Sequence, residues 1–464
     1  MTAPVAVPLW LFVLIIAFAL AAFASNFLLP SVRWFFRRRV ERAVARLNQR
    51  LDRPIDLFKL AERQDRIARL IYDASVLEAV SEHAAANGMP GSVALEQARR
   101  YAREIVPGFS TTLYFGVAIR LARGLSRALY RVRFGRIDIA LRQIDPKATV
   151  IFVMNHRSNM DYVLVTWLVA GRASISYAVG EWARFWPMAP LIRAMGAYFI
   201  RRSSRNALYR RVLARYVQMA TAEGITQAIF PEGGLSLDGR VGPARLGLLS
   251  YIMAGHDSGR DVVFVPVGLA YDRVLEDHIL TDAHAAGNRR FRGKPLTIFA
   301  FAAATLGRIG MRRFKGFGTA AAAFGAPVSL AAYREAHPGA TAEQLGQHLM
   351  AAIGRMVPVV PVALVAAALR EAPGSQAALA VIMTRLVAAL AAVGAVLKLP
   401  PQGMQATLAE GLTPLIARGL VAADLRPMPG AQRLLDFYSA AVLQRLVAAP
   451  PEVLASGSAA TRQT

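Results

Sequence analysis

The chain opens with a long stretch that contains no charged side chain. Residues 1–32 lack Asp, Glu, Lys and Arg, and residues 10–29 are almost entirely apolar. About 20 consecutive apolar residues are enough for a helix to cross the hydrocarbon core of a bilayer. Trp10 and Trp34 stand near the ends of the run, where interfacial aromatic residues are common. The pattern predicts a transmembrane anchor over residues 1–32.

Basic residues follow the predicted anchor at once. Seven arginines lie between residues 33 and 50, whereas no Lys or Arg precedes Leu9. Positive residues favour the cytoplasmic side of a membrane helix. We therefore expect a single-pass protein of the cell (inner) membrane whose catalytic part is cytoplasmic. A secretory signal peptide fits less well, because such peptides carry a basic residue before a shorter apolar run.

Residues 33–145 read as a helical N-terminal region. Apolar positions recur at helical spacing over residues 57–71 and 92–105. Residues 111–132 combine apolar side chains with arginines at positions 120, 123, 127 and 131. Two interpretations stay open for this segment: it lies on a membrane surface, or it packs on the core with its arginines in water. We favour the second, because packed helices with a charged outer face are the commoner case.

Between residues 146 and 330, short apolar runs alternate with helical patterns. Four runs read as strands, at residues 148–154, 196–202, 227–230 and 262–269. The last contains Pro266, which we expect at an edge or a bulge that borders a pocket, because proline cannot donate to a central ladder. The alternation predicts an α/β domain at 146–330, a mixed sheet flanked by helices.

The remaining residues, 331–464, are rich in Ala, Leu and Val and are divided by prolines. This pattern predicts a helical C-terminal region, either buried or resting on a membrane. Residues 381–399 contain Arg385 and Lys398 and make a poor second span.

Composition narrows the functional classes. The 464 residues include no cysteine, which excludes disulfide bonds and a cysteine acyl-enzyme. The formal net charge is +25, and 55% of the residues are hydrophobic. Such a charge attracts anionic membrane lipid. Nucleic acid is not an expected partner, because the basic residues lack an aromatic stacking pattern or a recognisable binding module.

Residues 155–161, Asn-His-Arg-Ser-Asn-Met-Asp, carry the clearest candidate chemistry. They place one imidazole five residues before a carboxylate, between a predicted strand and a predicted helix. If His156 lies on the turn before the helix, Asp161 can accept its Nδ1 proton, and Nε2 can take a proton from a substrate hydroxyl. Ser158 and Asp161 also fit a capping box, in which the carboxylate only closes the helix end. As metal ligands, two such residues without a third make a poor site, so no metal and no cofactor are expected.

Four sequence blocks follow one another from this segment onward. They are His156-Arg-Ser-Asn-Met-Asp-Tyr162, Phe185-Trp-Pro187, Gly196-Ala-Tyr-Phe-Ile-Arg-Arg202 and Glu232-Gly-Gly-Leu-Ser236. In composition, order and spacing they resemble the glycerolipid acyltransferase superfamily, and within it most of all the glycerol-3-phosphate acyltransferases. The resemblance covers residues 150–275 and implies the α/β fold of that family.

The resemblance adds a set of expected site residues. His156 is expected as the general base and Asp161 as the carboxylate that orients it. The expected substrate-binding residues are Arg157, Ser158, Arg201, Arg202, Glu232, Gly233, Gly234, Ser236, Arg240 and Pro266.

Three of these arginines are the expected phosphate ligands. The planar forks of Arg201 and Arg202 suit phosphate oxygens. Neighbouring side chains of a strand point to opposite faces, so a second interpretation has only one of them reach the site. The family usually carries an arginine after the two glycines, and this chain has Leu235. We therefore expect Arg240 to share the phosphate, and the identity of the acceptor stays open.

Together these observations predict an acyltransferase. A thioester, of coenzyme A or of acyl carrier protein, is already activated, so one base on the acceptor is enough and no covalent intermediate is obligatory. The expected acceptor is the hydroxyl of glycerol 3-phosphate, in an early step of phospholipid biosynthesis. Two alternatives remain: acylation of lysophosphatidic acid or another lysolipid, and a non-catalytic membrane protein that binds anionic lipid.

Overall fold

The computed structural model describes most of the chain beyond residue 62. Described are residues 63–135, 141–142, 144–170, 172–180, 188–201, 204–256, 259–287, 314 and 316–447, with single positions 8, 10, 13 and 16. The chain divides into two units, Met1–Ile55 and Asp56–Thr464, and almost all described residues belong to the second. The predicted anchor at residues 1–32 falls almost wholly outside the described residues.

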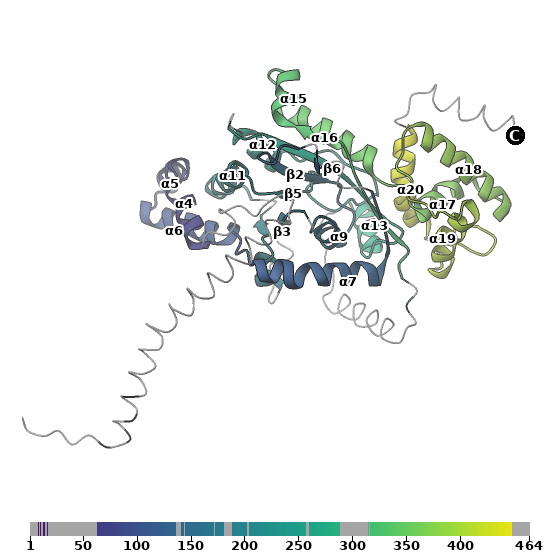
Figure 1. The fold of residues 1–464 in the computed structure, drawn as a ribbon, viewed down its shortest axis with the longest axis horizontal. Helices are drawn as coiled ribbons and strands as arrows, with labels where there is room; N and C mark the ends of the chain where they lie inside the picture. The colour runs from purple at the N-terminus through teal and green to yellow at the C-terminus, as the bar shows by residue number, and fades with distance from the viewer. Residues whose placement is uncertain are drawn as a thin grey trace, which may run out of the picture. The chain divides into compact units, whose positions relative to one another are not determined.

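An eight-stranded mixed sheet forms the centre of the second unit (Figure 1). The strands lie in the order β1-β7-β6-β2-β5-β3-β4, and β8 also pairs with β6. Their bounds are β1 Arg131–Phe134, β2 Thr149–Met154, β3 Ser176–Gly180, β4 Tyr198–Ile200, β5 Gln227–Ile229, β6 Val262–Tyr271, β7 Thr319–Phe324 and β8 Val328–Ser329. Strands β7 and β8 run antiparallel to β6, and the other pairs are parallel. The predicted mixed sheet is confirmed.

Helices cover both faces of this sheet (Figure 1). One face carries α11 (Ala207–Ala222), α12 (Gly247–Ala254) and α16 (Ala342–Met356), and the N-terminal helices α4 (Arg63–Ile71), α5 (Ala74–Ala86) and α6 (Gly91–Ile105) belong to the same core. The other face carries α7 (Ile119–Leu129), α9 (Met160–Val169) and α13 (Asp277–Ala285). A π-helical segment, η2 (Thr112–Ala118), leads into α7. Two short helices, α10 (Met188–Ala194) and α15 (Leu330–Ala336), complete this part.

Strand β2 shows why its sequence is an uninterrupted apolar run. Phe152 and Met154 point into one core, and Ile151 and Val153 point into the other, as the two-residue period of a strand requires. A strand that is covered on both faces needs apolar side chains at every position. The residues that follow β2 are therefore held by a rigid element.

Pro266 was expected at an edge or a bulge, and the structure contradicts the edge position. It lies in β6, which pairs with β2 on one side and with β7 and β8 on the other, so it is not in an edge strand. On the second side, β8 pairs only as far as Phe264 and β7 begins to pair at Val267. The carbonyl of Pro266 accepts the N–H of Gly325 at this break. The missing N–H of the proline thus faces a gap in the ladder, and the central strand tolerates it.

The C-terminal residues form a helical group beside one end of the sheet (Figure 1). It contains α17 (Pro361–Ala368), the 3₁₀ turn η4 (Leu369–Glu371), α18 (Gln376–Ala392), α19 (Met404–Ala417) and α20 (Gln432–Val447). All eight residues of α17 are buried, so this helix is the centre of the group. Among the described helices, none is by itself long and apolar enough to cross a bilayer. The helical stretches Pro361–Glu371 and Gln376–Ala392 meet that test only as a pair, bent by 111°.

Candidate active site

His156 lies on the connection between β2 and α9. Strand β2 ends at Met154 and α9 begins at Met160. Asn155 fixes the start of this connection: its side-chain oxygen accepts the N–H of Leu269 at 2.7 Å, and its amide donates to the carbonyl of Leu269 at 3.0 Å. Because Leu269 belongs to β6, the connection is tied to the neighbouring strand as well as to its own.

Asp161, in the first turn of α9, holds the imidazole of His156. Its Oδ2 is 3.0 Å from Nδ1 of His156 and also accepts the backbone N–H groups of Arg157 and Ser158, at 2.7 and 3.0 Å. Its Oδ1 accepts the hydroxyl of Tyr271 at 2.8 Å. Four donors thus fix a fully buried carboxylate. With the Nδ1 proton directed at Asp161, Nε2 carries the lone pair that can accept a proton.

The alternative role of Asp161 as a helix cap is partly present as well. Its carboxylate accepts the N–H of Ser158, which is one half of a capping box. The hydroxyl of Ser158 takes other partners: it accepts the N–H of Met160 at 3.2 Å and donates to Glu276 at 2.8 Å. The same carboxylate therefore orients His156 and closes the helix end, and the two interpretations are compatible.

Aromatic rings enclose the imidazole. The ring of His156 stacks on Phe230 with centroids 4.0 Å apart, and Tyr162 meets it edge-on at 5.6 Å. Only 1% of His156 is exposed to solvent. An acceptor hydroxyl therefore reaches Nε2 only when a neighbouring side chain or segment moves.

Glu232 joins the turn after β5 to the turn after β2. Its Oε1 accepts the backbone N–H of His156 at 2.9 Å, and its Oε2 accepts the N–H of Gly242 at 3.3 Å. Burial raises the pKa of Glu232 to about 7. Glu232, which was expected in the acceptor pocket, thus holds the backbone of the base in place.

The glycines and Ser236 shape the loop that follows Glu232. Gly233 has φ +69°, and a Cβ there would come within 2.5 Å of Arg245. Gly234 is buried beside it. Ser236 donates its N–H to the carbonyl of His156 at 2.9 Å. These contacts hold the loop against the base.

The side chains of Ser236, Arg157 and Ser158 bind protein atoms. The hydroxyl of Ser236 donates to the carbonyl of Arg240 at 2.7 Å. The buried guanidinium of Arg157 donates to the carbonyl of Gly239. Ser158 is held by Glu276, as described above. The structure therefore shows these three expected substrate-binding residues in contacts that build the site.

The expected phosphate ligands do not lie together. Arg201 follows β4, which lies three strands away from β2, and forms a double ion pair with Glu104 at 2.9 and 2.6 Å. Its guanidinium carbon is 5.4 Å from the rings of Tyr101 and Tyr209. Strand spacing alone puts the two strands about 14 Å apart. In this structure Arg201 thus braces α6 against β4.

Arg240 and Arg202 differ in what the structure shows of them. The side chain of Arg240 is 68% exposed, and its Nε lies 4.0 Å from the carboxylate of Asp238. Leu235 packs partly buried against the core. Arg202 and the block at residues 185–187 lie outside the described residues. Pro266 takes part in sheet pairing, as described above. Its predicted role in substrate binding stays a prediction.

Sequence reasoning missed two groups that position the base. Tyr271, whose hydroxyl binds Asp161, was not among the expected site residues. Glu276 was not expected at all, although its Oε1 accepts the N–H and the side-chain amide of Asn159 at 3.2 and 3.0 Å. An acidic residue five positions after a strand end is a weak signal, because such residues are usually solvated.

Helix α20 was the larger omission, since three of its residues hold the loops of the site. The ring of Phe437 lies 5.6 Å from the guanidinium carbon of Arg157. Its carbonyl is so close to Gly239 that a Cβ there would come within 1.9 Å. The side chain of Gln444 accepts the N–H of Val241 at 2.9 Å and donates to its carbonyl at 3.0 Å.

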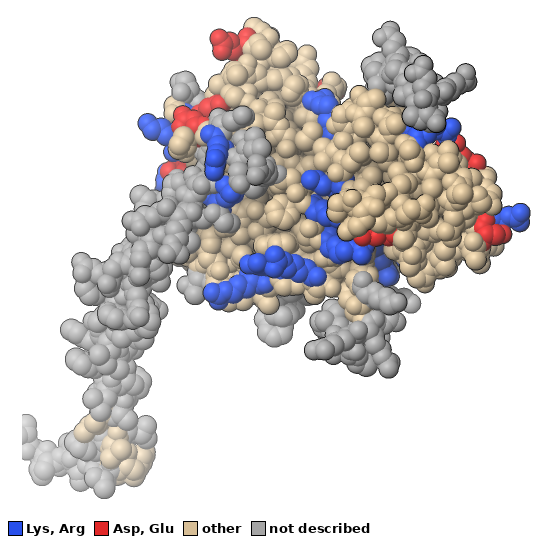
Figure 2. Space-filling view, turned by 45° about the vertical axis from the view of Figure 1, so that its right-hand side comes forward, with Lys and Arg blue, Asp and Glu red and all other residues tan. Residues whose placement is uncertain are grey.

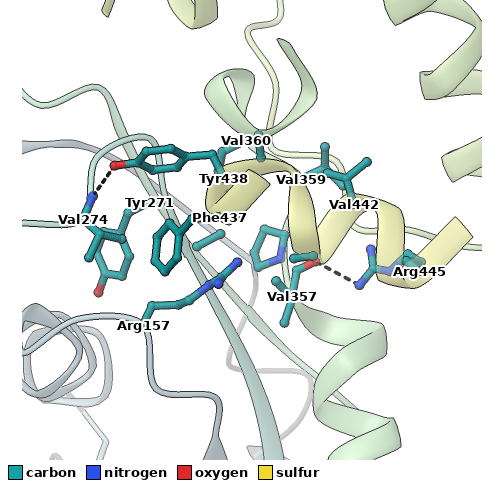
Figure 3. Close-up of a pocket in the computed structure, with 14 residues that line it drawn as sticks. Arg157, Tyr271, Val274, Val357, Val359, Val360, Phe437, Tyr438, Val442 and Arg445 are labelled. Carbon is teal, nitrogen blue, oxygen red and sulfur yellow. Dashed lines mark hydrogen bonds between the residues drawn. The ribbon is translucent and has the colours of Figure 1, made fainter. Parts of the chain in front are cut away.

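Tyr438 connects α20 to a second loop (Figure 3). Its hydroxyl accepts the N–H of Val274 at 3.2 Å and donates to Asp277 at 2.5 Å. Arg418 donates to the same carboxylate at 2.5 Å. Asp277 directly follows Glu276, which binds Ser158 in the connection that carries His156. The C-terminal helices are therefore linked to this connection through Asp277 and Glu276.

A small cavity separates β6 from α20. It is lined by Arg157, Tyr271 and Phe437 together with several valines (Figure 3), and its volume is about 20 Å³. That volume holds about one water molecule. It is too small for an acyl chain. Elsewhere within the described residues, no three His, Asp or Glu side chains gather as a metal site requires.

Comparison with known proteins agrees with the sequence blocks. The family model described as Acyltransferase matches residues 136–270. A glycerol-3-phosphate acyltransferase of Aeromonas hydrophila is 28% identical over 299 residues, which are 62% of this chain and 35% of that protein. The one of Shewanella loihica is 30% identical over 298 residues, again 62% and 35%. The resemblance inferred from the four blocks is confirmed, and the chain spans about a third of the length of these curated relatives.

One solved structure is similar over part of the chain. It is the 1-acyl-sn-glycerophosphate acyltransferase of Thermotoga maritima, at 16% identity and a TM-score of 0.33, covering 52% of this chain and 76% of that one. A score this low supports no argument.

Proposed function

We propose that this protein transfers a fatty acyl group from an acyl thioester to the hydroxyl of glycerol 3-phosphate, because residues 136–270 match the family model described as Acyltransferase. The curated relatives carry that activity in their names. The observation that carries the proposal is the contact of 3.0 Å between Nδ1 of His156 and the buried carboxylate of Asp161. It leaves one ring nitrogen as a base, in a turn that two strands and a helix fix.

The reaction needs one proton carrier. Nε2 of His156 takes the proton of the acceptor hydroxyl while the hydroxyl oxygen forms a bond to the thioester carbonyl carbon. The carbon–sulfur bond then breaks, and the departing thiolate takes the proton back from the imidazolium. Asp161 stabilises the imidazolium between these steps, and Tyr271 keeps the carboxylate in place. No protein acyl intermediate is needed.

The acceptor phosphate is the least constrained part of the proposal. Arg240 is exposed and lies in the loop that follows Glu232, so its side chain can turn to bind the acceptor phosphate. Arg201 binds phosphate only if it leaves Glu104. Leu235 supplies no charge where the family usually has an arginine. That substitution keeps a lysolipid acceptor as the second candidate.

The surroundings of the reaction follow from the sequence pattern. We propose anchoring at the cell (inner) membrane through residues 1–32, with the site on the cytoplasmic side, where anionic lipid lies. Acyl-CoA and acyl carrier protein thioesters are both suitable donors. A protein that only binds anionic lipid is the alternative of another class, and the fixed His156–Asp161 pair argues against it.

The proposal is tested with membranes that contain the full chain. Glycerol 3-phosphate, lysophosphatidate and dihydroxyacetone phosphate are supplied separately, each with a labelled thioester of coenzyme A or of acyl carrier protein. We expect the largest turnover with glycerol 3-phosphate. A preference for lysophosphatidate would select the second candidate, and a Leu235→Arg variant that shifts the preference back would locate the cause. No transfer to any acceptor would overturn the assignment.

A further inference from the structure

Helix α7 and the turn before it expose a row of apolar side chains. Val117, Leu121 and Leu125 are 44%, 65% and 41% exposed. Their spacing of four residues places them along one side of the helix. A single exposed leucine is ordinary, but a contiguous apolar row on a protein surface marks a place where another apolar surface binds.

Arginines lie beside this row. Arg120, Arg123 and Arg127 are exposed and spaced by three and four residues, so they form a second stripe next to the first. No Asp or Glu occurs between residues 105 and 137. Figure 2 shows basic side chains in a row low on the molecule, at the height at which Figure 1 places α7. Among the described residues, none of these three arginines forms a salt bridge, so the surface is both apolar and positively charged.

We propose that α7 is a docking helix for an anionic bilayer surface, with Val117, Leu121 and Leu125 entering the acyl region and the arginines binding lipid phosphates. A helix with an apolar side and a basic flank binds in this way. Nucleic acid would bind the arginines but leave the leucines in water. A second copy of the chain would bring two positive stripes together, so the charge pattern favours lipid.

The inner side of α7 gives this surface a relation to the reaction. Ala122 and Leu129 are buried, and Leu129 belongs to the core that contains α9. On α9, Trp167 lies 5.3 Å from the guanidinium carbon of Arg127, and Asp161 is in its first turn. Docking thus brings α9, whose Asp161 orients the base, close to the bilayer surface. This consequence rests on the proposed function, whereas the docking itself does not.

The absence of cysteine makes a direct test possible. A single cysteine is introduced at Leu121 of the full chain and labelled with an environment-sensitive fluorophore. The matched control carries the same label at Val93, which is 47% exposed on α6. Both are reconstituted in vesicles with anionic phospholipid and in vesicles of phosphatidylcholine alone. Quenching by iodide and by lipid-attached nitroxide is then measured.

We expect the label at position 121 to be shielded from iodide and quenched by the nitroxide lipid in anionic vesicles only, while the label at 93 stays open to iodide. In an Arg120→Gln, Arg123→Gln background the nitroxide quenching should weaken, by about fivefold in partitioning for each charge. Equal iodide access at both positions would overturn the proposal. So would equal shielding at position 121 without vesicles, which would indicate a protein contact, or in phosphatidylcholine alone. None of these readouts depends on acyl transfer.

Discussion

At the scale of single residues, Asp161 is the point where the sequence motif and the rest of the fold meet. Two of its donors are backbone groups of the motif itself, the third is the imidazole of His156, and the fourth is Tyr271 from β6. The motif alone therefore supplies only part of the geometry. The hydroxyl of Tyr271 fixes the second carboxylate oxygen and with it the plane of the group.

Replacing Tyr271 with Phe should lower kcat with little change in the acceptor KM. A hydrogen bond to a charged group is worth about 1.5–3 kcal/mol, so the expected loss is about tenfold to a hundredfold. Tyr130→Phe is the matched control, because the ring of this buried tyrosine packs against Tyr271 but its hydroxyl donates to the carbonyl of Arg273. Equal losses in both variants would show that packing, and not the bond to Asp161, matters.

Glu232 should give the protein a pH-dependent stability. Burial raises its pKa from 4.5 to about 7 in the folded state. The folded state therefore binds this proton more tightly than the unfolded state, and the resulting stability is present below pH 4.5 and lost as the pH rises through 7. The difference corresponds to about 3 kcal/mol.

The Glu232→Gln variant isolates this contribution. Urea unfolding at several pH values between 4.5 and 8 should show a fall in the free energy of unfolding that is smaller in the variant than in the native chain. The brace to Gly242 is weakened in the variant at every pH, so the comparison concerns the slope. Parallel curves would contradict the assignment of the titration to Glu232.

A substitution of Arg240 tests whether this side chain binds the acceptor phosphate. If it binds the acceptor phosphate, Arg240→Gln should raise the KM for glycerol 3-phosphate by about tenfold, as expected for one charge-assisted contact, and leave kcat near its native value. Arg205→Gln, another exposed arginine, controls for the loss of one charge. If both variants change KM alike, only the general field of the protein is involved.

Whether the role of a residue could be predicted depends on how far away in the sequence its contact partners lie. His156 and Asp161 lie within five positions of each other, so local geometry was enough to pair them. Arg201 could not be assigned in this way, because its partner Glu104 is 97 residues away and belongs to helix α6. An arginine pair beside a strand looks the same in sequence whether it binds phosphate or a carboxylate.

At the scale of elements, α20 is the part that the sequence could not connect to the site. Gln444 holds the loop at Val241 from 203 residues away. Its two hydrogen bonds close the loop that carries Ser236 and Arg240 against the helix. The C-terminal region, which sequence patterns describe only as helical, therefore contributes directly to the geometry around His156.

A Gln444→Ala variant should loosen that loop without unfolding the protein. Two lost hydrogen bonds correspond to about 1–3 kcal/mol, so amide hydrogen exchange in a peptide covering residues 236–242 should become faster and acyl transfer should fall several-fold. Gln432→Ala is the control, because this side chain contacts Asp436 within the same helix. Unchanged exchange in the loop would show that α20 does not hold it.

Where a strand lies in the sequence was easier to predict than which strands pair with it in the sheet. The apolar run of β2 follows from its burial on both faces. The edge position expected for Pro266 was wrong, whereas the alternative of an irregularity in the ladder fits the gap that β8 and β7 leave opposite it. Strand order is set by packing between distant segments, so a rule about proline in one strand cannot locate that strand in the sheet.

At the scale of the whole molecule, the α/β class follows from the alternation of apolar runs and helical patterns. The net charge of +25 is less specific. Arg157 and Arg201, which were expected to bind substrate, are engaged within the fold, and so is Arg418. The arginines proposed to bind lipid on α7 are distinguished by their exposure and by the absence of Asp and Glu between residues 105 and 137, and exposure is a property that only the structure provides.

The most direct test of the account is the acyl-transfer rate of a His156→Ala variant of the full chain in membranes, with glycerol 3-phosphate and a labelled thioester. General-base catalysis contributes about 10² to 10⁴ in rate, so we predict a loss of that size, with membrane binding retained and the loops of the site intact by hydrogen exchange. A variant that transfers acyl groups at the native rate would contradict the assignment of His156 as the base.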